Sequence, residues 1–237
     1  MELLLCFPSL LSSTEMTVLH VHHHHRYNDG PEDVTSTLGR ERGLGAMTYW
    51  FEYGFIVKSY TFREVYRRGA RRSFRRRRAQ FAFDLGVCLC SVLTLLVLAP
   101  QAGFFDWLLP ALLSHVTFGY FSWLTHAPAR DQAGAVSSIN NVDNLLNFFI
   151  FNQGFHAIHH AHPGIHWSEI PDKLGLMKEI DDSLIVPYWV SINSAWRIVA
   201  PERFRDAKFG AIWRQRLARR NEQGNVRARR LPQFVWI

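Results

Sequence analysis

The chain has 237 residues, enough for one sizeable domain, and a formal net charge of +7. Hydrophobic residues make up 48%, aromatic residues 14% and charged residues 20%, so polar and apolar segments must be segregated along the chain. The three cysteines, Cys6, Cys88 and Cys90, exclude a disulfide framework and a cysteine-ligated iron–sulfur cluster. The sequence also has no Gly-rich dinucleotide fingerprint.

A cluster of histidines follows an apolar stretch at residues 2–11, which is too short to span a bilayer because spanning takes roughly 20 residues. Histidine occupies position 20 and positions 22 to 25. On an α-helix, His20 would share a face with His23 and His24. Neutral imidazole binds iron, copper, zinc or nickel, so the cluster is a candidate metal site. The alternatives are a remnant of an affinity tag or an inert His-rich tract.

A polar loop is predicted at residues 28–45. Residues 47–66 mix aromatic and charged side chains, which is typical of a helix that lies at the level of the lipid headgroups. Arginines then recur every four residues from Arg67 to Arg78, so a helix would stack them on one face. Such a patch binds nucleic acid or marks the cytoplasmic side of a membrane helix. We favour the membrane interpretation, with anionic headgroups and not nucleic acid as the partner.

Two apolar runs follow this basic patch, at residues 81–99 and 104–124, and Pro100 to Gly103 separates them as a turn. Each run has about the length of a spanning helix. The pattern predicts a transmembrane hairpin that starts and ends in the cytoplasm. Two crossings return the chain to the side that it left, so histidines before and after the hairpin can share one site on the cytoplasmic face.

The second histidine cluster lies after the hairpin. His156, His159 and His160 are spaced to share one face of a helix, although polar surface is the alternative for such a triplet. His126 lies at the predicted membrane exit, and His115 is expected to be a packed residue within the second run. The expected fold class is therefore mainly α, a helical membrane protein with a transmembrane hairpin and a cytoplasmic helical cap that carries the histidines. Residues 1–200 form the predicted domain, and residues 201–237 form a basic C-terminal tail.

With these motifs the chain resembles the membrane-bound fatty acid desaturase and hydroxylase superfamily, whose members carry three His boxes. His156-Ala157-Ile158-His159-His160 matches the third box, and Asn152-Gln153-Gly154-Phe155 before it also resembles that family. The first cluster matches the second box in two registers, His20/His23/His24 or His20/His24/His25. We favour the second, because Arg26-Tyr27 then directly follows the histidine pair. His126 fits a further ligand position at a membrane helix end, although Ser122 replaces the asparagine that accompanies it.

The resemblance implies the candidate metal ligands His20, His23, His24, His25, His126, His156, His159 and His160. It implies a di-iron centre with O2 as co-substrate, dehydrogenation of a membrane lipid or acyl substrate, and an external electron donor of the ferredoxin or cytochrome b5 type. Asp143, Asn147 and Glu169 are candidates for orienting the imidazoles. Because the family's first His box is missing before His20, we expect an N-terminally shortened chain. A lipid or carotenoid hydroxylase and a catalytically incompetent remnant are the alternative functions.

Overall fold

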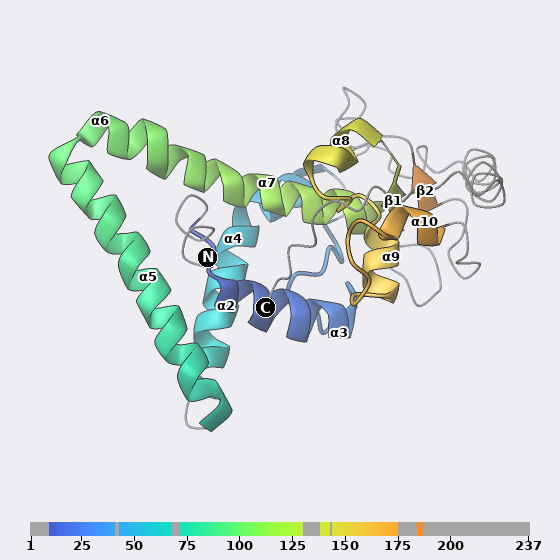
Figure 1. The fold of residues 1–237 in the computed structure, drawn as a ribbon, viewed down its shortest axis with the longest axis horizontal. Helices are drawn as coiled ribbons and strands as arrows, with labels where there is room; N and C mark the ends of the chain where they lie inside the picture. The colour runs from blue at the N-terminus through green and yellow to red at the C-terminus, as the bar shows by residue number, and fades with distance from the viewer. Residues whose placement is uncertain are drawn as a thin grey trace.

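The computed structural model describes residues 10–40, 43–67, 72–129, 138–142, 144–174 and 184–186, and these residues are mainly helical (Figure 1). The basic tail at 201–237, Arg68–Arg71 and Asp143 lie outside the described residues. The N-terminal half contains α2 (Ser13–Glu15), η1 (Met16–His24), α3 (His25–Tyr27), α4 (Gly43–Arg67) and α5 (Arg72–Leu98). The remainder contains α6 (Pro100–Ala102), η2 (Gly103–Leu108), α7 (Leu109–His126), η3 (Ala127–Ala129), β1 (Asn140–Asn141), α8 (Asn144–Phe149), α9 (His156–Ala161), α10 (Ile170–Leu174) and β2 (Ile185–Val186).

One continuous helical segment, from α2 through η1 to α3, carries the first histidine cluster. A capping box starts it: the Ser12 hydroxyl accepts the Glu15 N–H at 3.1 Å, and the Glu15 carboxylate accepts the Ser12 N–H at 2.6 Å. The same carboxylate forms an ion pair with Lys58 of α4 at 3.1 Å. Asn28 ends the segment in the left-handed conformation, which asparagine tolerates better than most residues. The helical segment that carries the first cluster is therefore bound to α4 at its N-terminal end and continues into a loop at its C-terminal end.

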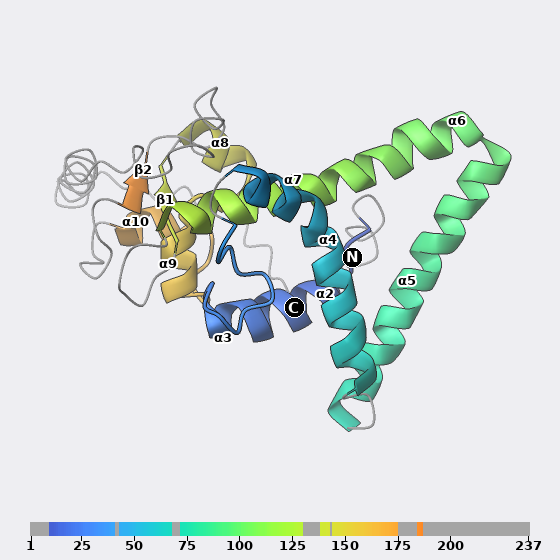
Figure 2. The same ribbon diagram turned by 180° about the vertical axis from the view of Figure 1, so that it is seen from behind.

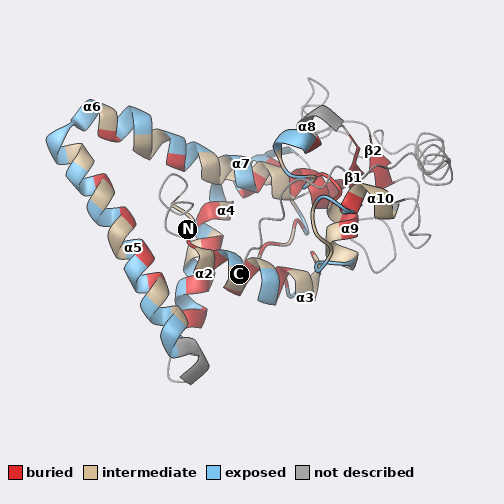
Figure 3. Cartoon of the chain, in the orientation of Figure 1, coloured by how far each residue is buried: buried red, intermediate tan, exposed pale blue. Residues whose placement is uncertain are grey.

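Helices α5 and α7 are joined by a bend at α6 and spread apart from it (Figures 1 and 2), so the expected hairpin is present as a chain reversal, but only one of its two arms qualifies as a membrane-spanning helix among the described residues. The predicted turn at 100–103 is itself helical, because Pro100 occupies the first helical position, where its missing N–H costs nothing. Much of the surface of α5 is exposed (Figure 3), and beyond its arginine-rich start this surface includes large apolar side chains such as Phe83, Leu89 and Leu93. Among the described residues, the segment Arg75–Leu98 is long and apolar enough to cross a membrane by length and composition. The other arm is interrupted by the π-helix η2 and carries polar side chains such as His115 and Thr117.

Helix α4 crosses α7 closely, and glycines make the approach possible. A Cβ atom added at Gly119 of α7 would lie 2.6 Å from the Trp50 carbonyl oxygen of α4. A Cβ atom at Gly54 of α4 would lie 2.5 Å from the His115 ring. Below this crossing, Tyr49 and Trp123 are fully buried in a shared aromatic core. The crossing fixes the C-terminal end of α7, and with it His126, relative to the N-terminal half of the chain.

A small parallel pair of strands supports the third His box. Asn140 of β1 pairs with Ile185 of β2, and Asn141 pairs with Val186. The Asn147 side chain spans this region, because its Nδ2 donates to the Asn141 carbonyl at 2.7 Å and its Oδ1 accepts the Gly154 N–H at 2.9 Å. A buried apolar cluster that includes Ala157 and Ile158 anchors the back of α9. Its front is thereby left to the histidines.

Candidate metal centre

The π-helical winding of η1 decides which histidines of the first cluster face the same way. In a π-helix each N–H bonds the carbonyl five residues earlier, as the His25 N–H does with the His20 carbonyl. Such a helix has about 4.4 residues per turn, so residues four and five apart share a face and a residue three apart lies roughly 115° away. His20, His24 and His25 therefore converge. His23, which an α-helical spacing would have chosen, points elsewhere.

Two other elements bring four more imidazoles to the same place. His126 is the last residue of α7, and His156, His159 and His160 lie on α9. His156 and His160 are four residues apart, so ordinary α-helical winding places them on one face. Segments separated by more than a hundred residues thus meet in one cluster.

The seven imidazoles form two adjacent groups, each compact enough to hold a metal ion. The first group (His24, His126, His156 and His160) has Nε2–Nε2 distances of 3.1 Å, 3.1 Å and 3.2 Å between successive members. The second group (His20, His25 and His159) has Nε2–Nε2 distances of 3.0 Å, 3.2 Å and 3.4 Å. The groups touch, because the rings of His25 and His160 stack with centroids 4.6 Å apart. Every one of the seven presents Nε2 to its group.

These distances match nitrogens that share one ion. Metal–imidazole bonds of about 2.0–2.1 Å place two nitrogens about 2.9 Å apart at a right angle and about 3.4 Å apart at the tetrahedral angle. The observed range of 3.0–3.4 Å lies between these limits. An all-imidazole donor set suits iron, copper, zinc or nickel.

Hydrogen bonding alone cannot satisfy the second group. In the plane of each ring, Nε2 carries either a hydrogen or a lone pair, and a hydrogen bond needs one of each. His20, His25 and His159 form a closed triangle of Nε2 contacts. Three atoms of two kinds cannot alternate around a triangle, so at least one contact must join two hydrogens or two lone pairs. A cation removes this conflict, because all three lone pairs then point at it.

The surroundings keep the imidazoles neutral, which metal binding requires. Burial and the neighbouring His159 and His24 lower the pKa of His25 to about 4. Burial and neighbouring histidines also lower the pKa values of His20, His156 and His160 well below their usual value. At neutral pH these side chains therefore offer lone pairs to a cation.

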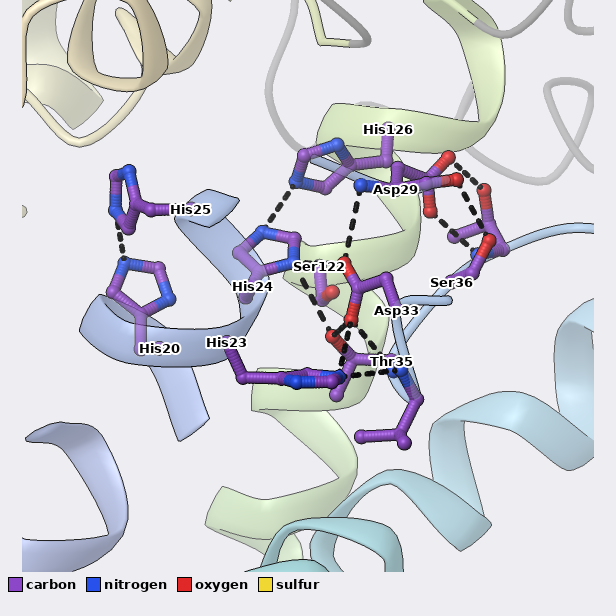
Figure 4. A network of polar contacts seen from close by, with 12 residues as sticks. His20, His23, His24, His25, Asp29, Asp33, Thr35, Ser36, Ser122 and His126 are labelled. Carbon is purple, nitrogen blue, oxygen red and sulfur yellow. Dashed lines mark hydrogen bonds and ion pairs between the residues drawn. The ribbon is translucent and has the colours of Figure 1, made fainter. Parts of the chain in front are cut away.

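A carboxylate outside the clusters orients His24 (Figure 4). Asp33 accepts from His24 Nδ1 at 2.6 Å, so the lone pair of His24 is directed through Nε2 toward His126. Thr35 donates to Asp33 from its N–H at 2.9 Å and from its hydroxyl at 2.7 Å, and the Asp29 N–H donates at 3.1 Å. Burial alone would raise the pKa of Asp33, but the hydrogen bonds from His24 and Thr35 outweigh it and hold this pKa well below its usual range. The sequence singled out neither Asp33 nor Asp29, because both lie in what was predicted as a polar loop.

The other sequence candidates lie outside the two groups. His23 accepts the Val34 N–H at its Nε2 (3.0 Å) and contacts the Tyr60 hydroxyl through Nδ1 (2.8 Å). Asn147 supports the backbone before the third box and not an imidazole, and Glu169 is exposed. Ser122 hydrogen-bonds the Tyr49 hydroxyl at 2.9 Å. His115 bonds its own helix at the Ala111 carbonyl, in agreement with the packed role predicted for it.

The fold and site define a helical protein with a candidate two-metal histidine centre at the C-terminal end of α7, away from the apolar helix α5 (Figure 1). The model of the family named "Fatty acid desaturase" matches residues 1–192, and the chain belongs to this family. The resemblance found in the His boxes is thereby confirmed. No curated protein and no solved structure gives a significant match to the chain. Membership implies an oxidoreductase of lipid acyl chains that uses a di-iron centre.

Proposed function

We propose that the protein is a membrane di-iron oxidoreductase that dehydrogenates a lipid acyl chain in an O2-dependent reaction. The observation that carries the proposal is the convergence of seven Nε2 atoms into two adjoining groups. One iron would be held by His24, His126, His156 and His160, and the other by His20, His25 and His159. His23 is left out of the ligand set because its ring is committed to Val34 and Tyr60.

The reaction requires a metal because removing hydrogen from an unactivated methylene is beyond any amino-acid side chain. When bound, the iron pair would supply the chemistry that reduces O2 and uses the resulting oxidising power on the acyl chain. The protein supplies the rest. The neutral imidazoles bind the ions, and Asp33 fixes the orientation and tautomer of His24. Electrons must arrive from outside, because the sequence has neither a cysteine set for an iron–sulfur cluster nor a dinucleotide fingerprint. A ferredoxin or cytochrome b5 type donor would meet this need.

The membrane part of the proposal rests on the hairpin. Helix α5 exposes large apolar side chains such as Phe83, Leu89 and Leu93, and α7 exposes Leu112 and Leu113. Exposed surface of this kind fits lipid better than water. The exposed arginines Arg75, Arg76 and Arg78 at the start of α5 would then mark the cytoplasmic side. Because the hairpin crosses twice, the histidine centre lies on that side, as the shared cluster requires.

The proposal is tested by measuring the iron content of the purified protein and identifying the product of the reaction that it catalyses. Protein purified in detergent should contain about two irons per chain, and with O2, an electron donor and a lipid substrate it should form a double bond. A hydroxylated product with the same iron content would assign the chain to the hydroxylases. Absence of bound iron after reconstitution under reducing conditions would refute the enzyme and leave the non-catalytic remnant.

A further inference from the structure

Three phenylalanines stand out on the surface immediately before the third His box. Phe148, Phe149 and Phe151, here called the phenylalanine knuckle, are 71%, 67% and 60% exposed. Ile150 between them turns inward and packs against the aromatic core of α4 and α7. We propose that the knuckle inserts into the lipid interface and seats the third His box against the membrane surface. This inference rests on the proposed function, because it needs the hairpin to be in a bilayer.

The backbone is strained to hold the knuckle outward. Phe151 has φ 52° and Asn152 has φ 59°, both in the left-handed region, which a bulky aromatic residue rarely adopts. Hydrogen bonds maintain this conformation: the Asn152 N–H donates to the Asn147 carbonyl at 2.8 Å, and its Nδ2 donates to the Trp167 carbonyl at 2.9 Å. Glycine or asparagine at position 151 would adopt this conformation with less strain. One edge of the Phe151 ring contacts Trp167, with ring centroids 5.3 Å apart, but 60% of the residue stays exposed and available to a partner outside the fold.

The position of the knuckle identifies lipid as its partner. Ile150 packs against a core that includes Trp50 and Tyr120, and both of these are only partly buried. Tryptophan and tyrosine concentrate where a membrane protein passes from hydrocarbon to water. Trp123 lies one helical turn before His126, so this level is where α7 leaves the membrane in the proposed topology. Helix α8 lies beside that end of α7 and far from the bend at α6 (Figures 1 and 2).

The composition of the segment also favours lipid over a protein partner. Residues 144–153 contain no charged side chain. A water-accessible protein interface has a polar rim around its apolar centre, whereas a lipid contact needs only apolar surface.

Spin-label accessibility tests the proposal in the whole protein reconstituted in phosphatidylcholine vesicles. With Cys6, Cys88 and Cys90 replaced by alanine, single labels are placed at Phe149→Cys, Leu93→Cys and Gly164→Cys. Gly164 is a matched control, because it flanks the same His box on the other side and an added Cβ meets nothing within 4 Å. We expect the ratio of oxygen to nickel-chelate collisions to be several-fold higher at 149 and 93 than at 164.

The outcomes separate the knuckle from the hairpin. If the collision ratio at position 149 equals that at 164 while the ratio at 93 stays high, the lipid contact of the knuckle is overturned and the membrane hairpin is not. If the collision ratio at position 93 is also that of a water-exposed label, both the membrane hairpin and the lipid contact of the knuckle are overturned. Exclusion of both reagents from 149, with spin–spin broadening between copies, would assign the surface to a second copy of the chain and would also overturn the proposal.

A second variant separates lipid contact from folding. Phe151→Asn relieves the left-handed strain while removing one ring of the knuckle, so in detergent its thermal midpoint should be equal to or above that of the parent. In vesicles the same variant should lower the oxygen-to-nickel ratio at 149. A lowered midpoint together with an unchanged ratio would show that Phe151 serves packing on Trp167 and would overturn its assignment to lipid.

Discussion

Replacing Asp33 by asparagine should loosen one of the two metals and spare the other. Asp33 orients His24, which belongs to the group of four imidazoles, and it touches none of the three imidazoles in the other group. The substitution keeps the volume but removes the negative charge, so a charge-assisted hydrogen bond of 2.6 Å becomes a neutral one at best. Hydrogen bonds to charged groups contribute about 1.5–3 kcal/mol. At about 1.4 kcal/mol per factor of ten, the expected loss of affinity is roughly 10- to 100-fold.

The assay is a chelator titration of the iron-loaded protein in detergent, with retained iron measured per chain. The parent should release its iron in one tight range, and D33N should release about half of it at a chelator concentration lower by the predicted factor. Asp29→Asn is the matched control. Asp29 is as buried as Asp33 and lies in the same loop, but its carboxylate binds the Thr37 N–H (2.6 Å) and the Thr37 hydroxyl (3.0 Å). Equal iron retention by D33N and D29N would refute the reasoning.

Three further outcomes are expected. His25→Ala should lose the iron of the group of three. His23→Ala should keep both irons but lose about 1–3 kcal/mol of unfolding free energy, because the Val34 N–H then lacks its acceptor. Iron analysis and thermal unfolding would contradict this if both variants behaved alike. Gly119→Ala should destabilise the protein by about 1–3 kcal/mol, because the added Cβ atom would clash with α4. Gly86→Ala is the control and should not destabilise it, because an added Cβ atom there meets open space. Equal unfolding midpoints for the two variants would contradict the close crossing of α4 and α7. The metal-free protein should lose stability as pH falls from about 6.5 toward 4, because the unfolded chain protonates histidines whose pKa the fold lowers, His25 to about 4. Melting curves independent of pH across that window would count against it.

Much of the architecture follows from patterns that are local in the sequence. The lengths of the apolar runs and the position of Pro100 were sufficient to predict two long helices with a bend between them. The spacing of His156 and His160 places both on one face of α9 because that helix has ordinary α winding. Family membership, which the third box indicated, is also confirmed.

The rest depends on features that residue spacing does not carry. Spacing left two registers for the first cluster, and the π winding of η1 brings together His20, His24 and His25. Asp33 could not be identified, because the chain must first turn through Asn28 and Asp29, both with positive φ, before the carboxylate returns to His24. Side chains of a polar loop look the same in a sequence whether they face water or an imidazole.

The winding of η1 makes the first His box sensitive to changes that never touch an ion. If Met16–His24 shifted to four-residue hydrogen bonding, His25 would rotate off the shared face and His23 would rotate toward it. The group of three would lose a donor although every imidazole was still present in the sequence. The hydrogen-bonding pattern of the helix backbone thus decides which imidazoles can bind a metal ion together. The number of histidines in the sequence does not determine this by itself.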